Sequence, residues 1–200
     1  MVMSKQQQAP GDLEHIRAFV NTIDVEQGHD QLASPVALAA WLQSSGLMAR
    51  AATATSADLA HAVALRESLR AILLAHSGDS PVPGAAAQEL DHACARARVR
   101  LHFDELGAAV LVPEADGVDG GLGRLLAIVH QAIAQETWTR LKACRDHTCE
   151  WAFYDHTKNR SGTWCSMAVC GNRAKARAYR KRRSAPGSGT PPADACEDDG

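Results

Sequence analysis

Apolar side chains recur every three or four residues along most of the first 140 residues, which is the spacing of helices with one buried face. Ser34 and Pro35 mark one helix start, because a serine hydroxyl caps free N–H groups and proline lacks the N–H that a first turn leaves unpaired. Gly46 ends that helix. The pattern predicts helices at residues 15–23, 34–46, 56–77, 84–98 and 122–141. The last of these leads directly into Cys144.

Two short runs depart from this spacing. Residues 99–103 and 108–112 are alternating or continuously apolar, and the polar residues between them favour a β-hairpin. Alanine and leucine dominate the chain and aromatic residues make up only 4%, a composition that favours helices over sheets. We therefore predict a mainly α protein, in which an N-terminal helical domain contains one small hairpin.

Four cysteines near the C-terminus form two pairs. Four residues separate Cys144 from Cys149, fifteen lead on to Cys165, and four more separate Cys165 from Cys170. Zinc prefers four soft ligands in a tetrahedron, and two closely spaced pairs of thiolates supply them. The spacing predicts a C-terminal module built around one structural Zn2+.

The remaining sequence favours a reducing compartment. The N-terminus lacks the apolar centre of a signal peptide, and no apolar run approaches the ~20 residues of a membrane-spanning helix. We expect a cytoplasmic protein with no membrane partner, in which paired cysteines bind metal rather than form disulfides. Cys94 is then a thiol of a helix core, and Cys196 a free thiol.

The segment between the two cysteine pairs predicts a short β-hairpin. Residues 151–155 are strand-like, and residues 161–163 turn the chain back. Four aromatic residues would give the module a small core of its own: Trp151, Phe153, Tyr154 and Trp164. We interpret His147 and His156 as surface residues, because four cysteines already complete the zinc shell.

Charge is segregated along the chain. Residues 1–140 carry 16 acidic and 10 basic side chains, whereas residues 141–183 carry 3 acidic and 11 basic ones. Seven cations and no anion fall in the alanine-rich segment 173–183, which indicates a helix that contacts nucleic acid rather than an ordinary solvated face. The candidate contacts are Arg173, Lys175, Arg177, Arg180, Lys181, Arg182 and Arg183.

A helix that begins at Ser166 would place three arginines on one exposed stripe, since Arg173, Arg177 and Arg180 stand at i, i+4 and i+7. We expect Arg173 and Arg177 to reach base edges in a major groove and the other cations to meet phosphates. Arg173 has an equal alternative role, which is to clamp the second cysteine pair.

These patterns divide the chain into four segments: a flexible N-terminus at residues 1–12, a helical domain at 13–140, a zinc module with a basic helix at 141–183, and a disordered acidic tail at 184–200. The tail carries four acidic residues and no basic one. We expect it to fold back on the basic helix and weaken non-specific binding.

The tetrapeptide Cys170-Gly171-Asn172-Arg173 ends the cysteine array. Together with Phe153-Tyr154-Asp155, Lys158-Asn159-Arg160-Ser161 and the run 164–177, it closely resembles the CGNR zinc finger family over residues 141–183. In that family the finger usually follows a helical domain called ABATE, described as a stress-induced transcription regulator. Residues 19–24 and 32–42 look like the opening of that domain, so the resemblance implies a regulator.

The helical domain shows no catalytic arrangement of residues. Its histidines are scattered, and the glycines at positions 120, 121 and 123 lack the lysine of a phosphate-binding loop. Asn21 and Asp24 lie in a polar cluster between predicted helices and are candidates for a small-molecule effector pocket. Loop capping is the favoured alternative for both residues.

The sequence therefore predicts a non-enzymatic, zinc-dependent DNA-binding transcription regulator, whose helical domain senses an effector or forms a homodimer. The alternative is a zinc-stabilised module that docks RNA or an acidic protein partner. A zinc enzyme is disfavoured, because four thiolates leave no open position for an activated water.

Overall fold

The computed structural model describes residues 8–78 and 80–184, and its contacts divide the chain into two compact units. The first unit runs to Cys165, and the second begins at Ser166. Residues 1–7 of the predicted flexible N-terminus (1–12) and residues 185–200 of the predicted acidic tail (184–200) lie outside the described residues. Within the described part of the chain, no helix combines the length and the apolar character that a membrane span requires.

The first unit is mainly helical, as predicted, with three short two-stranded sheets among its described residues. Its elements are α1 (Leu13–Val20), β1 (Ile23–Asp24), β2 (His29–Asp30), α2 (Pro35–Ser44), α3 (Ser56–His76), α4 (Gly84–Ala97), β3 (Val99–Phe103), β4 (Ala109–Pro113), α5 (Gly117–Ala134), the 3-10 turn η2 (Trp138–Arg140), β5 (Leu141–Ala143) and β6 (Ala152–Tyr154). The second unit contains the π-helical turn η3 (Met167–Gly171) and α6 (Asn172–Ser184).

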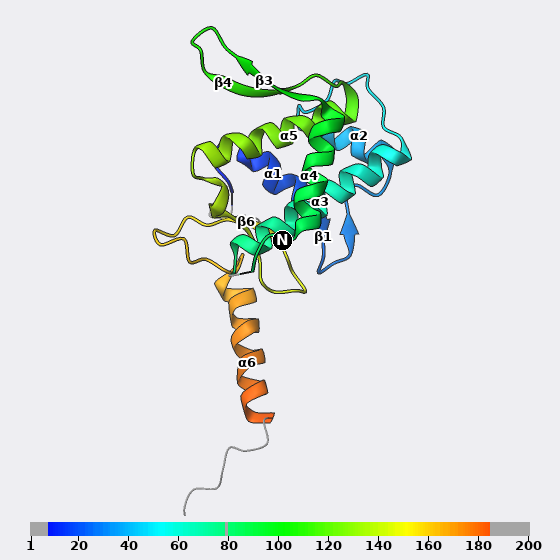
Figure 1. Ribbon diagram of the computed structural model, residues 1–200. Coiled ribbons are helices and arrows are strands. Elements are labelled where there is room, and N and C mark those ends of the chain that lie inside the picture. Colours follow the sequence, from blue (N-terminus) through cyan, green and yellow to red (C-terminus); the bar gives the residue numbers. More distant parts are fainter. Residues whose placement is uncertain (1–7, 79, 185–200) are drawn as a thin grey trace, which may run out of the picture. The chain divides into compact units, whose positions relative to one another are not determined.

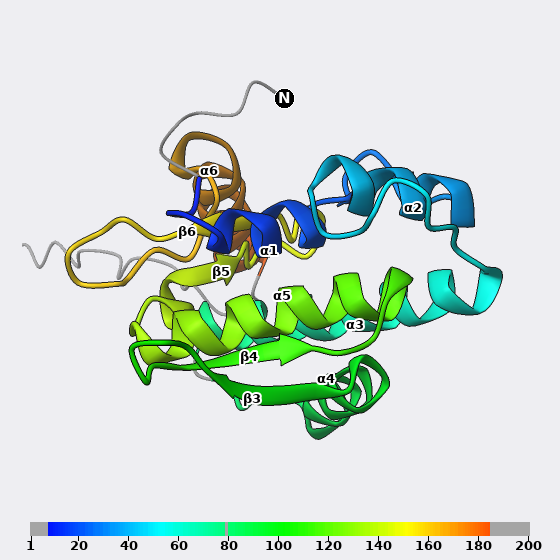
Figure 2. The same ribbon diagram turned by 90° about the horizontal axis from the view of Figure 1, so that it is seen from above.

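Helices α3 and α5 run side by side and form the centre of the first unit (Figure 1, Figure 2). Helix α4 packs on α3 and α5, and α1 also packs on both. The core between them is apolar: Ile16 and Phe19 of α1, Leu65 and Leu69 of α3 and Leu125 of α5 are fully buried. Burial of one face of each helix is what stabilises this arrangement.

The helix starts follow from side-chain caps. Ser34 Oγ accepts a hydrogen bond from the Ala37 N–H at 3.2 Å, so the predicted start of α2 is confirmed. Helix α3 begins with a capping box, in which Thr55 and Asp58 each accept the other's backbone N–H.

The first helix ends earlier than predicted. Helix α1 stops at Val20, and Ile23, which we expected on its apolar face, lies in β1. Thr22 Oγ1 donates to the Phe19 carbonyl at 2.8 Å. Such a local bond from a side chain satisfies a carbonyl at the helix end and lets the chain turn.

The last long helix is displaced from its prediction. Helix α5 begins at Gly117 rather than Leu122 and ends at Ala134, so it does not run into Cys144. Its internal glycines allow close packing, since a Cβ on Gly123 would lie 2.6 Å from Ala97 Cβ. A larger residue at this position would collide with Ala97, so glycine fits here although its helix propensity is poor.

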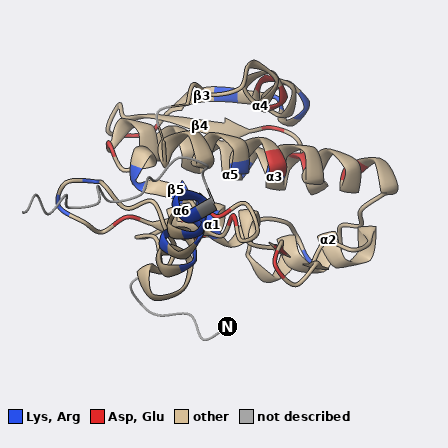
Figure 3. Cartoon of the chain, turned by 90° about the horizontal axis from the view of Figure 1, so that it is seen from below, with Lys and Arg blue, Asp and Glu red and all other residues tan. Residues whose placement is uncertain are grey.

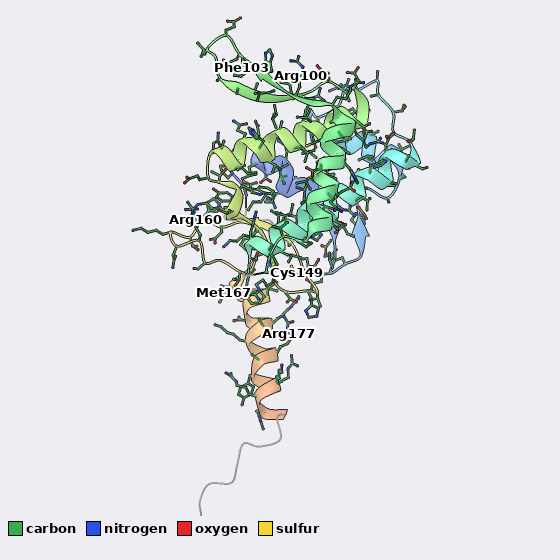
Figure 4. The ribbon with its side chains drawn as sticks, viewed as in Figure 1. Arg100, Phe103, Cys149, Arg160, Met167 and Arg177 are labelled. Carbon is green, nitrogen blue, oxygen red and sulfur yellow. The ribbon has the colours of Figure 1, made fainter. Side chains whose placement is uncertain are left out.

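The predicted hairpin at residues 99–112 is confirmed as β3 and β4, with Leu101 opposite Leu111. Strand β4 lies along α5 (Figure 2). The hairpin leaves large apolar side chains exposed, since Leu101 is 51% and Phe103 61% accessible (Figure 4).

Candidate metal centre and nucleic-acid interface

The four predicted zinc ligands come together. The Sγ atoms of Cys144, Cys149, Cys165 and Cys170 all lie within 4.8 Å of one another, and all four residues are buried. Cys149 Sγ and Cys165 Sγ are 3.6 Å apart, well beyond a disulfide of ~2.05 Å and near the ~3.8 Å edge of a tetrahedron with Zn–S distances of ~2.3 Å. The four thiols therefore fit one structural Zn2+, which would cross-link them and contribute folding free energy.

The electrostatics of this cluster favour a bound cation. Hydrogen bonds from Cys149 and Cys165 lower the pKa of Cys144 to about 2. The bonds to Cys144 raise the pKa of Cys149 to about 12, and bonds to both partners raise that of Cys165 further. Without a metal only one thiolate is favoured, because like charges at this distance repel. A divalent cation removes that repulsion, so that all four cysteines ionise.

The turn between the first two ligands is organised by Asp146, which is fully buried. Its carbonyl accepts the backbone N–H groups of Cys149 at 2.7 Å and Glu150 at 3.0 Å. Its carboxylate Oδ1 accepts the Thr148 hydroxyl at 2.9 Å. These bonds close the four-residue spacer into a knuckle, so that Cys144 and Cys149 face the same point.

The strand pairing around this knuckle differs from the prediction. Residues 152–154 do form a strand, β6, but it pairs with β5 ahead of the knuckle, with Leu141 opposite Tyr154. The predicted hairpin between the two cysteine pairs is therefore wrong, because the strand at residues 152–154 pairs with a strand that precedes the first cysteine pair. The apolar spacing predicts a helix that ends at Leu141, but helix α5 ends at Ala134 and the chain is extended by Leu141.

Strands β5 and β6 share the core of the helices. All six of their residues are buried, and Leu141, Ala143, Ala152 and Tyr154 belong to the same apolar cluster as α1 and α3. The aromatic residues we expected to form a separate small core are thus divided, with Tyr154 in the main core. The first unit consequently includes three of the four zinc ligands.

Asn21 joins the end of α1 to β6. Its Nδ2 donates to the Ala152 carbonyl at 2.9 Å, and its Oδ1 accepts the Ala152 N–H at 2.7 Å. The residue is only 5% exposed. Asp24 instead caps a turn, because its Oδ1 accepts the Gln27 N–H at 3.0 Å. The Asp24 contact supports the capping alternative, whereas Asn21 pairs with a distant strand rather than capping its own loop. An effector pocket at Asn21 and Asp24 stays a prediction.

Two buried arginines of α3 extend this connection. Arg70 donates to the Val20 carbonyl at the end of α1 at 2.7 Å and to the Glu150 carbonyl beside the knuckle at 3.0 Å. Arg66 forms a two-point pair with the Asp30 carboxylate, at 2.8 and 2.9 Å. The two arginine side chains are 3% and 4% exposed, and each buried charge is matched by an acceptor.

Side chains at the C-terminal end of α3 bind backbone carbonyls of β5. His76 Nδ1 lies 2.9 Å from the Leu141 carbonyl, which requires the ring to donate, and Ser77 Oγ donates to the Ala143 carbonyl at 2.5 Å. The His76 ring also meets Trp138 edge-on, at 5.2 Å between centroids. Burial lowers the pKa of His76, with the charge of Lys142 acting in the same direction.

The connecting roles of Arg66 and Arg70 were not predicted from the sequence, although their positions on α3 indicate buried partners. Arg66 and Arg70 stand four residues apart on the same face as Leu69 and Leu73, which are buried. Arginines within an apolar stripe indicate buried acceptors, because an unpaired buried charge is strongly unfavourable. Which acceptors they reach is set by contacts 36 to 80 residues away.

In the second unit, Ser166 caps the helical segment as predicted, since its Oγ accepts the Val169 N–H at 3.3 Å. The first turn is nevertheless π-helical, because the Gly171 N–H donates to the Ser166 carbonyl five residues back. Cys170 lies within this turn. Asn172 donates to the Ala168 carbonyl at 3.0 Å, a local capping role.

All seven predicted nucleic-acid contacts lie on α6, where Lys and Arg residues gather (Figure 3). Arg173 and Arg177 are half-buried, so the predicted arginine stripe is only partly exposed. The other cations are exposed: Lys175, Arg180, Lys181, Arg182 and Arg183. Arg183 lies over the Tyr179 ring, 5.8 Å from its centroid.

Comparison with known families agrees with this architecture. A family model described as CGNR zinc finger matches residues 140–183. A second model, ABATE, described as a putative stress-induced transcription regulator, matches residues 16–139 and thus more than half of the chain. A search among curated proteins gives no match. The chain therefore belongs to the ABATE family and carries a C-terminal CGNR zinc finger with a four-cysteine site.

Proposed function

We propose that this chain is a zinc-dependent DNA-binding transcription regulator, in which α6 contacts duplex DNA. The observation that carries the proposal is the continuity of ligand and helix: Cys170 lies in η3, and η3 continues directly into α6. Helix α6 bears seven cations and no anion. Its metal ligand would thus fix the start of a strongly cationic helix, which suits the phosphate backbone of DNA.

The exposed cations at the end of the helix, Lys181, Arg182 and Arg183, are assigned to phosphates, as are Lys175 and Arg180. Arg173 and Arg177 are assigned to base edges near the start of the helix. Alanines at positions 174, 176 and 178 keep α6 narrow enough for a major groove about 12 Å wide.

The ABATE helices are assigned to sensing an effector or to dimerisation, in keeping with the family's description as a regulator. The zinc is assigned a structural role, because a shell of four thiolates leaves no position for a substrate or an activated water. The proposal includes a cytoplasmic location, where the chain would reach DNA and keep its thiols reduced.

Fluorescence anisotropy with a labelled DNA duplex tests this function. The zinc-loaded chain should bind with a steep salt dependence, and the triple variant K181Q/R182Q/R183Q should lower the slope of log K against log salt by ~2.7, at ~0.9 for each phosphate contact. Cys165→Ser should lose zinc and bind weakly. An unchanged slope in the triple variant, or tighter binding to an RNA hairpin or an acidic peptide, would contradict the assignment to DNA.

A further inference from the structure

Residues 155–162, which we call the Asp155 loop, form neither helix nor strand, yet buried charges hold them in place. Asp155 Oδ2 accepts Lys142 Nζ at 2.8 Å and the Gly162 N–H at 2.7 Å. Lys142 Nζ also donates to the Arg160 and Gly162 carbonyls, at 2.5 and 3.0 Å. The Lys142 and Asp155 side chains are 5% and 1% exposed, so the ion pair lies inside the loop.

The start of the loop is held equally firmly. Asp155 Oδ1 accepts both the hydroxyl and the N–H of Thr157, at 2.6 and 2.9 Å. Arg140, on η2, donates to the Asp155 and Thr157 carbonyls at 3.0 Å each. A Cβ on Gly162 would lie 2.9 Å from the Asp155 carboxylate, so this approach requires glycine. These contacts restrain the shape of the loop at both of its ends.

This rigid loop presents cations to solvent. Lys158 and Arg160 are exposed, and neither side chain has an ion pair or hydrogen bond to any residue that the structure describes. Arg160 has φ +53°, a left-handed conformation that costs a non-glycine residue about 1 kcal/mol or more. Figure 4 labels Arg160 on this loop, which extends away from the helices of the first unit in two views (Figure 1, Figure 2).

The only carboxylate of the loop does not cancel these charges. Burial acts to raise the pKa of Asp155, but hydrogen bonds from Lys142, Thr157 and Gly162 outweigh it and lower the pKa to about 2. The negative charge of the ionised Asp155 is thus balanced by the buried ammonium group of Lys142. The outer residues of the loop, 156–161, contain two cations, a histidine and no anion.

We propose that the Asp155 loop is a second DNA-contacting element, in which Lys158 and Arg160 bind backbone phosphates. This proposal rests on the function proposed above, and it adds a contact that belongs to the first unit rather than to α6. Residues 1–140 carry more acidic than basic side chains, which disfavours contact with DNA, so an exposed cationic loop is a favourable place for a contact in the first unit. The loop offers charge and hydrogen-bond donors suited to phosphates, and no exposed apolar side chain suited to a protein interface.

The salt dependence of duplex binding tests the loop separately from α6. In the full-length, zinc-loaded chain, K158Q and R160Q should each reduce the slope of log K against log salt by ~0.9, and the double variant by ~1.8. The exchange K158R/R160K keeps both charges and should keep the slope. Arg50→Gln is the matched control, because Arg50 is an exposed cation of the same unit outside the loop.

Zinc content and thermal unfolding should be unchanged in all of these variants, since the substituted side chains form no hydrogen bond or ion pair with the residues that the structure describes. If the parent chain binds duplex and K158Q/R160Q has the parent's slope, the loop proposal is overturned while α6 keeps its role. If the parent chain shows no salt-dependent binding to duplex, or binds only an acidic peptide, the proposed function fails and the loop contact fails with it. Equal reductions of the salt slope in R50Q and K158Q would also overturn the loop proposal, since the reduction would then reflect the loss of any positive charge rather than a contact of the loop.

Discussion

The side-chain amide of Asn21 pairs with both backbone groups of Ala152, which lies 131 residues further along the chain. Ala152 stands three residues after the zinc ligand Cys149, in a strand that shares the core of the helices. The amide thus takes the place of a neighbouring strand at the edge of β6. This contact, together with the bonds of Arg70 to Val20 and Glu150, joins the end of the first ABATE helix to the zinc finger.

Replacement of Asn21 should therefore affect both stability and metal retention. Asn21→Asp keeps the shape but places a carboxylate oxygen against the Ala152 carbonyl, and it should reduce the free energy of unfolding by about 3 kcal/mol. Asn21→Ala should cost less, about 1–3 kcal/mol. Denaturant unfolding measures the change, and a zinc-chelator competition should show faster loss of the metal.

The matched control is Asn159→Asp, the same chemical change at an exposed position. It should leave the free energy of unfolding within about 0.5 kcal/mol of the parent. Equal stability of the Asn21→Asp variant and this control would show that the contact to Ala152 is unimportant.

Zinc removal should destabilise the helices as well as the finger. Strands β5 and β6 flank the first knuckle and supply Leu141 and Tyr154 to the common core, so a loosened knuckle should loosen that core. Thermal unfolding with and without a chelator should show a lower midpoint for the metal-free chain, and Cys149→Ser should reproduce it. Cys94→Ser, outside the cluster, should keep the zinc and the midpoint. Identical midpoints for chelated and zinc-loaded protein would contradict this coupling.

The buried pair of Lys142 and Asp155 should behave as one unit. Lys142→Met and Asp155→Asn each leave a buried partner uncompensated, and each should cost about 3–5 kcal/mol. The double variant should cost less than the two losses combined, because no unpaired charge remains. A double-mutant cycle by denaturant unfolding measures this coupling, and additive losses would argue against a specific pair.

The pH dependence of stability should carry a contribution from His76. Its pKa is lowered by burial, so the folded chain favours the neutral ring and binds fewer protons than the unfolded chain. The contribution is fully present above the ordinary pKa of ~6.5 and is lost as pH falls towards the lower folded value. His76→Asn keeps a side-chain donor without a titrating ring, and it should lose less stability between pH 7.5 and pH 6 than the parent. Zinc content must be equal at both pH values, and parallel losses in the two proteins would refute the assignment.

Local signals predicted the parts of this protein that depend on neighbours in sequence. Ser34 and Pro35 gave the start of α2, and the spacing of the cysteines gave the metal ligands. The run of cations gave the helical segment that became α6. Each of these features is set within a few residues, by capping, ligand spacing or charge.

Features that depend on distant contacts were not predictable in the same way. Helix α5 includes Gly120, Gly121 and Gly123. Close packing favours glycine at these positions, and helix propensities do not reveal such packing. Leu141 continued a helical spacing but pairs with Tyr154 in a sheet. The acceptors of Arg66 and Arg70 likewise became known only from the fold.

The proposed function requires that the zinc-loaded chain reads DNA sequence. Selection of genomic DNA fragments at near-physiological salt, followed by sequencing, tests it most directly. We expect enrichment of a few discrete sites, which is lost in the Cys165→Ser variant and in K181Q/R182Q/R183Q. A flat profile for the zinc-loaded parent chain would contradict the claim, and it would leave the cationic helix as a non-specific, RNA-binding or protein-docking element.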